Sequence, residues 1–296
     1  MRYWVEWLMV RILSLKAAVL PRPLCLAGGR FFGLLFYYLC PKLRKIALSN
    51  LDIAFPSTSG GGDKRKIARR SFSHFGSVIM DILWGGRVKQ EAIQRLVEYQ
   101  GLENLERAYG KGRGVLLFTG HLGHWELMGV AQGYLGFPLS VVSRPLDNPY
   151  LEKMLYSYRC KSGNRVIHKK DAVKGILEAL KKKEGVAVLI DQNTLPQEGV
   201  FIRFFGRWAS TTPLLASLAL RTNAPLIPAF ALPVKNGRYR LIYGEEIEHG
   251  EFTDRSEAIV NLTQRCTDVI EGFIKRYPEY WLWIHQRWKS QPPQED

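Results

Sequence analysis

The chain has 296 residues, and its 42 Lys and Arg against 27 Asp and Glu give a net charge of +15. This length suits one large domain with a sizeable core and an extension. The positive charge predicts anionic partners, such as nucleic acid, an acidic protein, phospholipid headgroups or a phosphorylated substrate. The four cysteines are scattered, without a Cys-x-x-Cys pair or metal-ligand spacing, so neither a disulfide framework nor a zinc site is expected.

Residues 1–41 are very apolar and aromatic, but charged residues such as Glu6, Arg11 and Arg30 interrupt them. They contain no run of the ~18 uninterrupted apolar residues expected of a membrane span. The early Glu6 and the lack of an Ala-x-Ala site argue against a cleaved signal peptide. The pattern predicts apolar helices that lie in the membrane interface as an anchor. The alternative is a helical hairpin that packs on the domain and never touches lipid.

The rest of the chain, residues 42–290, is predicted to form one domain, followed by a frayed tail at 291–296. A basic amphipathic stretch ends before Pro56, residues 57–62 read as a loop, and Asp63 is a plausible N-cap for a helix that Gly85 and Gly86 end. Further strands are predicted at 114–119, 139–143, 186–190, 225–232 and 239–243, and further helices at 125–134, 148–160, 171–183, 212–222 and 254–276. This alternation predicts an α/β fold with a largely parallel central sheet flanked by helices.

The segment Gly120-His121-Leu122-Gly123-His124-Trp125-Glu126 carries the strongest chemical signal. A histidine at the end of a strand can take a proton from a hydroxyl if something fixes its tautomer, and a nearby carboxylate can do so. Five positions on one helix rotate by about 140°. His121 and Glu126 can therefore meet only if His121 lies in a turn and Glu126 in the first turn of the next helix. The alternative is a structural histidine in the core or at a cap.

This segment resembles the His-x4-Glu box of the glycerolipid acyltransferase superfamily, and most of all the late acyltransferases of lipid A biosynthesis. Their usual form is Gly-His-Phe-Gly-Asn-Trp-Glu, so His124 departs from the pattern and is a rival for the role of base. His121 stands at the position of the family's catalytic histidine. Four further blocks are similar to family segments in the expected order, at 143–149, 191–192, 199–213 and 278–289.

Five more residues are candidates for substrate binding. Arg144 and Asp191 follow apolar strands, where ligands of open α/β sheets gather. Arg144 could clamp a phosphate or phosphopantetheine, while Asp191, paired with Gln192, could orient a basic residue or cap a helix. Arg203 and Arg207 flank two phenylalanines and could hold an acidic headgroup, with a solvated loop as the alternative. The cluster of Trp281, Trp283 and Trp288 is predicted to be packing.

The resemblance implies a membrane-associated O-acyltransferase at the cytoplasmic face of the bacterial inner membrane. His121, oriented by Glu126, would deprotonate a hydroxyl of a lipid A precursor, an anionic glycolipid, which attacks the thioester of an acyl carrier protein or acyl-CoA. Gly-x-Ser-x-Gly is absent from the sequence, so direct transfer is expected. No metal, cofactor or nucleic acid is predicted. The alternatives are another glycolipid acceptor, such as a phosphatidylinositol mannoside, or a non-catalytic basic protein of the membrane surface.

Overall fold

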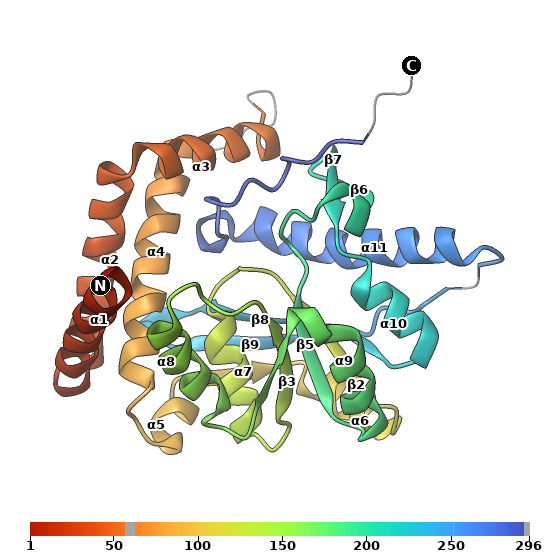
Figure 1. Cartoon of the computed structure of the whole chain (residues 1–296), viewed down its shortest axis with the longest axis horizontal. Coiled ribbons are helices and arrows are strands. Elements are labelled where there is room, and N and C mark those ends of the chain that lie inside the picture. Colours follow the sequence, from red (N-terminus) through yellow and green to blue (C-terminus); the bar gives the residue numbers. More distant parts are fainter. Residues whose placement is uncertain (57–62, 251, 293–296) are drawn as a thin grey trace.

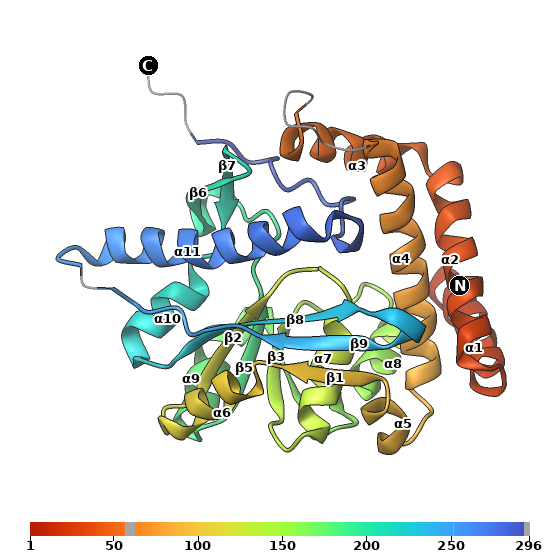
Figure 2. The same cartoon turned by 180° about the vertical axis from the view of Figure 1, so that it is seen from behind.

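The computed structural model describes residues 1–56, 63–250 and 252–292, so the predicted loop at 57–62 and the end of the tail lie outside the described residues. Its centre is a seven-stranded sheet in the order β1–β9–β8–β2–β5–β3–β4 (Figures 1 and 2). The strands are β1 Val97–Gln100, β2 Val115–Thr119, β3 Leu139–Ser143, β4 Arg165–His168, β5 Gly185–Leu189, β8 Leu226–Pro233 and β9 Tyr239–Tyr243. Within it only β8 and β9 pair antiparallel.

Helices cover both faces of this sheet, and the side chains of β2 are accordingly buried on both faces. Its side chains alternate between two cores: Leu116 and Phe118 pack on one face, and Val115 and Leu117 on the other. The first face is covered by α9 Ala172–Lys181, α10 Leu214–Thr222 and α11 Arg255–Arg276; the second by α6 Leu102–Gly110, α7 Trp125–Tyr134 and α8 Pro149–Cys160. The predicted α/β class with a mostly parallel sheet is confirmed.

Several elements were not predicted. They include β1, β4, α6 and the short helix α5 Gln90–Gln94, and a separate antiparallel hairpin of β6 Val200–Phe204 and β7 Arg207–Thr211. Two hydrogen bonds join the hairpin to α11: the backbone N–H of Phe205 donates to Glu271, and that of Arg203 donates to Gln264. Short single turns lie at η2 Lys169–Asp171, η3 Pro196–Glu198, η4 Lys235–Gly237 and η5 Pro278–Tyr280.

Four long helices and the short α5 precede the sheet; the long ones are α1 Arg2–Val19, α2 Arg22–Leu39, α3 Pro41–Ala54 and α4 Lys64–Gly85. Helices α2 and α4 lie side by side at one end of the molecule (Figures 1 and 2) and approach closely through glycines. A Cβ atom on Gly33 would lie 2.1 Å from the Phe72 carbonyl oxygen, and one on Gly76 would lie 2.1 Å from that of Gly29. This contact fixes α2 to the sheet-bearing part of the chain.

A buried ion pair strengthens the same junction. Two guanidinium nitrogens of Arg22 on α2 donate to the Asp81 carboxylate on α4 at 2.7 and 2.6 Å, and a third donates to the Gly237 carbonyl at 2.6 Å.

In the part of the chain that is described, no helix taken alone combines the length and hydropathy of a membrane span. Helices α2 and α3 together do, but they meet at an angle of 92°.

Candidate active site

The turn formed by residues 120–124 follows β2 and is held from two sides. The His124 N–H donates to the Ala231 carbonyl on β8 at 2.8 Å, and the Gly123 N–H donates to that of Tyr280 at 2.9 Å. The His121 carbonyl accepts a bond of 3.0 Å from the Leu282 N–H. Gly123 has a φ of 67°, and a Cβ there would lie 2.0 Å from the Ala231 oxygen, so only glycine fits. The backbone that carries His121 is therefore fixed.

Asp191 orients His121. It follows β5, the parallel neighbour of β2, so the carboxyl ends of the two strands bring the residues together. The Asp191 Oδ1 atom lies 2.9 Å from His121 Nδ1, and Oδ2 accepts the His121 backbone N–H at 2.7 Å and the Trp281 indole N–H at 2.7 Å. Burial raises the pKa of Asp191, but the charge of His121 and these hydrogen bonds outweigh burial and lower the pKa to about 2. The carboxylate is thus ionised near neutral pH and accepts the Nδ1 proton.

This geometry leaves the other nitrogen of His121 able to accept a proton. With the proton on Nδ1, the lone pair is on Nε2, which lies 3.4 Å from the Gln192 amide nitrogen. About 20% of the His121 side chain is exposed, whereas only 2% of the Asp191 side chain is. A hydroxyl can therefore reach Nε2 from solvent, while Asp191 stays behind the ring.

The described residues show no direct contact between Glu126 and His121, the pair in which Glu126 was predicted to orient the histidine. Glu126 does lie in the first turn of α7, but its carboxylate faces α8, where Arg159 donates to it through Nε at 2.8 Å and through a second guanidinium nitrogen. Glu126 reaches His121 only through Trp125, whose indole N–H donates to Glu126 at 3.2 Å and whose ring centroid lies 5.0 Å from that of His121. Glu126 therefore holds the Trp125 indole, which lies beside the His121 ring.

His124, the rival for the base, is fully buried. Its Nδ1 accepts the Leu127 N–H at 3.2 Å and so caps α7, and its Nε2 lies 3.7 Å from an Asp81 carboxylate oxygen. Burial lowers the pKa of His124 to about 4, although Asp81 and Glu126 act in the opposite direction. An acceptor hydroxyl has no access to this ring. The location of His124 favours a capping role, which asparagine can also fill.

The three arginines predicted to bind substrate are exposed, and none of the hydrogen bonds or ion pairs found among the described residues joins them to His121 or Asp191. Arg144 follows β3, its side chain is 77% exposed, and it pairs with Asp147 at 3.2 Å. Arg203 stacks on Trp208 with its guanidinium carbon 3.7 Å from the ring centroid, and Arg207 lies at the hairpin tip. The opposite end of the hairpin reaches the 191–194 segment, and a strand rises about 3.4 Å per residue. Arg207 therefore lies roughly 13 Å along the strand from Thr211.

Two supporting residues were missed at the sequence level. Trp281 was assigned to packing, yet its indole N–H holds Asp191. Arg287 is fully buried and donates to the carbonyls of Ser210 at 2.6 Å and Gln192 at 3.4 Å. Burial lowers the pKa of Arg287 to about 10 against the effect of Asp191. Both residues belong to the tail block at 278–289, so that block is the signal that could have placed them at the site.

Within the described ranges, no group of three or more His, Cys, Asp or Glu side chains could hold a metal ion. The site consists of a histidine that can accept a proton at Nε2, a buried carboxylate behind it and a neighbouring amide.

Comparison with known proteins agrees with this chemistry. The family described as "Bacterial lipid A biosynthesis acyltransferase" matches residues 1–290. The chain is 30% identical over 294 residues to the lipid A biosynthesis palmitoleoyltransferase of Escherichia coli K12, and 30% identical over 293 residues to the lauroyltransferase of the same strain. Each alignment covers 98% of this chain and 93% of the relative. It is 24% identical over 298 residues to the E. coli lipid A biosynthesis myristoyltransferase, with 99% and 90% coverage.

Among solved structures, the 1-acyl-sn-glycerophosphate acyltransferase PlsC from Thermotoga maritima covers 84% of this chain and 97% of its own, at a TM-score of 0.37 and 15% identity. That similarity is too low to carry an argument. The family match, which extends over nearly the whole chain and includes every residue of the site described above, is sufficient without it: this chain belongs to the bacterial lipid A biosynthesis acyltransferase family and is an acyltransferase.

Proposed function

We propose that the protein transfers a fatty acyl group from an acyl thioester to a hydroxyl of a lipid A precursor. The observation that carries the proposal is the pair of His121 and Asp191, in which a buried carboxylate accepts the Nδ1 proton and leaves Nε2 accessible. The three relatives compared above are all named for lipid A biosynthesis, which supports lipid A over a phosphatidylinositol mannoside as the acceptor class.

In the proposed reaction, His121 Nε2 takes the proton of the acceptor hydroxyl as its oxygen attacks the thioester carbonyl. Asp191 stabilises the imidazolium that forms. When the tetrahedral intermediate collapses, the carbon–sulfur bond breaks, the new ester remains on the acceptor, and the imidazolium returns its proton to the leaving thiolate. The transfer needs no acyl-enzyme, metal or cofactor.

Glu126 serves this reaction as a positioning residue in our proposal. It holds Arg159, which also donates to the Ser143 hydroxyl at 3.1 Å, and it fixes the indole of Trp125 beside the His121 ring. Gln192 lies near enough to Nε2 to contact the acceptor oxygen. Arg144 is free to exchange its surface partner Asp147 for an anionic group of a substrate, since exposed ion pairs are weak. Arg203 and Arg207 would contact only a distal part of a large lipid or the membrane.

We further propose that residues 1–41 attach the protein to the cytoplasmic face of the inner membrane, and that 42–290 form the acyltransferase domain. Helices α1 and α2 lie at one end of the molecule (Figure 1), and many of their large apolar side chains are exposed to solvent. Such a surface next to a net charge of +15 suits an anionic bilayer. The exposed residues include Trp4, Val5, Met9, Ile12, Leu15, Val19, Leu24, Phe31, Phe32, Phe36, Tyr38 and Leu39.

Two experiments test these proposals. Mass spectrometry of the lipids of cells without the protein should show lipid A that lacks one acyl chain; unchanged lipid A together with a changed glycolipid of another class would contradict the acceptor. The purified protein, offered the same acyl chain on acyl carrier protein and on coenzyme A, identifies the donor by kcat/KM. A protein that transfers from neither thioester would contradict the reaction.

A further inference from the structure

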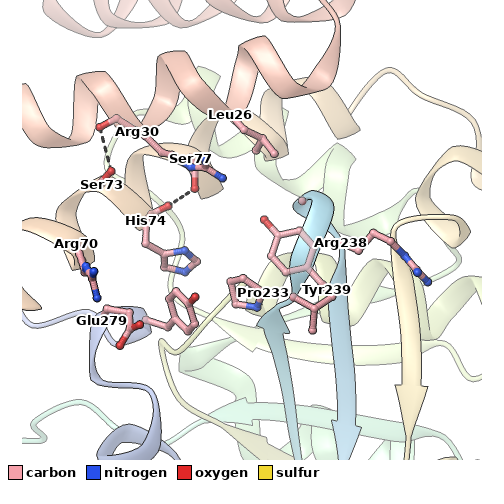
Figure 3. Close-up of a pocket in the computed structure, with 13 residues that line it drawn as sticks. Leu26, Arg30, Arg70, Ser73, His74, Ser77, Pro233, Arg238, Tyr239 and Glu279 are labelled. Atoms are coloured by element: carbon pink, nitrogen blue, oxygen red, sulfur yellow. Dashed lines mark hydrogen bonds between the residues drawn. The ribbon is translucent and has the colours of Figure 1, made fainter.

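A cavity borders the 120–124 turn, because two of its lining residues, His74 and Tyr280, contact Gly123. Its cavity volume is about 400 Å³, within the range of small-molecule sites. Four parts of the chain form it: α2, α4, the turn from β8 to β9, and η5 (Figure 3). It is distinct from the site of His121 and Asp191, neither of which lines it.

The charge of this cavity is positive. Arg30 on α2, Arg70 on α4 and Arg238 after β8 line it, and Glu279 is its one acidic lining residue within the described chain. Arg238 is held by Glu98 at 3.8 Å, but neither Arg30 nor Arg70 takes part in any of the ion pairs found among the described residues. Arg30 and Arg70 thus line one concave surface whose net charge is positive.

The guanidinium groups of Arg30 and Arg70 act on the same side chain. Burial raises the pKa of the Tyr280 phenol, whereas the charges of both arginines oppose that increase. Arg30 also acts on His74, whose pKa burial lowers to about 4. Figure 3 shows Arg30 above His74, and Arg70 on the same side of the cavity as Glu279. Arg30 and Arg70 therefore line the same cavity and both act on Tyr280 through their charge.

We propose that this cavity binds the phosphate group of a lipid headgroup, with Arg30 and Arg70 as its main ligands. Paired guanidinium groups match the geometry of phosphate oxygens and give strong charge-assisted hydrogen bonds. The hydroxyls of Ser73 and Ser77 lie on the same face of α4 and add polar lining. Helix α2, which contributes Leu26 and Arg30 to the lining, also carries exposed large apolar side chains, so an acyl chain attached to the phosphate could stay in the membrane.

The occupant would also lie against two residues, His74 and Tyr280, that contact the turn carrying His121. His74 Nε2 lies 3.1 Å from the Gly123 carbonyl and donates to it, and the Tyr280 carbonyl accepts the Gly123 N–H. A phosphate in the cavity would therefore brace the turn that carries the base. The occupant is either the phosphate of the acceptor, in which case the inference rests on the proposed function, or that of a bilayer phospholipid, in which case it does not.

Binding is tested first with inorganic phosphate on the full-length protein in neutral detergent, by calorimetry at constant ionic strength. The Arg30→Gln/Arg70→Gln variant should bind phosphate at least about tenfold more weakly than wild type. Glu279→Gln should bind it more tightly, because it removes the one carboxylate of the lining. The control is Arg221→Gln/Arg255→Gln, which removes the same charge from the exposed surfaces of α10 and α11 and should bind like wild type. Equal losses in both double variants, or no effect of Glu279→Gln, would overturn the proposal.

Two kinetic measurements then identify the source of the phosphate. If it belongs to the acceptor, Arg30→Gln/Arg70→Gln raises KM for the phosphorylated acceptor but not for the dephosphorylated one. If it belongs to the bilayer, the variant loses stimulation by phosphatidylcholine vesicles that contain phosphatidic acid, whichever acceptor is used. His121→Ala should abolish transfer and retain phosphate binding, which separates a failure of this inference from a failure of the proposed reaction.

Discussion

Asp191 Oδ1 lies 2.9 Å from His121 Nδ1, although 70 residues separate the two in the sequence. The backbone N–H of His121 donates to the other oxygen of the same carboxylate, so Asp191 fixes both the ring and the chain that carries it. Glu126, the carboxylate nearer in sequence, is bound to Arg159 instead. The two acidic residues therefore have separable roles.

The first prediction separates those roles. Asp191→Asn should lower kcat by at least ~100-fold and move the acidic limb of the pH–rate profile to lower pH, because the imidazolium loses its counter-charge. Glu126→Gln should lower activity through Trp125 and Arg159 but leave that limb in place, since Glu126 does not contact the imidazole. Profiles of kcat against pH for the two variants provide the measurement. A shift of the limb in Glu126→Gln alone would assign the orienting role to Glu126.

The second prediction concerns acid stability. His74 and His124 each have a pKa lowered to about 4 by burial, so the unfolded chain binds more protons than the folded one between pH 6.5 and 4, and stability falls as the pH falls through that window. The loss is on the order of 3 kcal/mol per histidine. His124→Asn keeps a cap on α7 and should reduce the slope while transfer activity stays near wild type. Chemical unfolding at a series of pH values measures this; an unchanged slope would contradict the assignment.

The third prediction concerns the junction of α2 and α4. Gly33→Ala would place a Cβ atom 2.1 Å from the Phe72 carbonyl oxygen, so the helices must separate, at a cost of about 1–3 kcal/mol in unfolding free energy. Gly28→Ala on the same helix is the matched control: nothing lies within 4 Å of its Cβ, and the higher helix propensity of alanine should be neutral or stabilising. Thermal unfolding of both variants decides; equal effects would mean that the close approach does not matter.

The fourth prediction concerns the net charge of +15. Raising salt shortens the Debye length from about 10 Å at 0.1 M to about 3 Å at 1 M and so screens the attraction between the positive protein and its anionic substrates. We therefore expect kcat/KM, which includes this encounter, to fall much more than kcat. Arg144→Ala should reproduce part of the fall at low salt, and Arg144→Lys should restore it only partly. Asp147→Asn, which frees Arg144 from its surface partner, should act in the opposite direction. Activity that is indifferent to salt and to these substitutions would remove Arg144 from the site.

Much of the central fold could be predicted because its elements have strong local patterns. The strand at 139–143 and the helix at 125–134 have the predicted limits. The hairpin of β6 and β7 was missed because its two-residue turn, Phe205-Gly206, has positive φ at both positions without the Asn-Gly pair that usually marks such turns. The antiparallel pairing of β8 and β9 was not predicted, although only six residues and no helix separate the predicted strands at 225–232 and 239–243, which is too short for a parallel crossover.

The residues of the site could be predicted from local patterns, but the contacts between them could not. His121 was found because a short motif surrounds it, and Asp191 because it follows a strand, but their contact depends on strand order. The chain places β3 and β4 between β2 and β5, yet β2 and β5 are neighbours in the sheet, which no local pattern reveals. The motif spacing pointed to Glu126 as the partner, and the direction of α7 sends that carboxylate to Arg159. Trp281 and Arg287 were read as ordinary packing or tail residues because each acts through a contact with the distant 191–192 segment.

The central claim is that His121 is the base for acyl transfer. Its most direct test is the single-turnover rate of transfer from a labelled acyl thioester to the lipid A precursor by His121→Ala, with His124→Asn as the control histidine variant. We expect His121→Ala to lower the rate by at least ~100-fold while its melting temperature stays near wild type, and His124→Asn to transfer at close to the wild-type rate. A His121→Ala protein that is folded and transfers within about threefold of wild type would show that His121 is not the base, because loss of a general base costs far more than that.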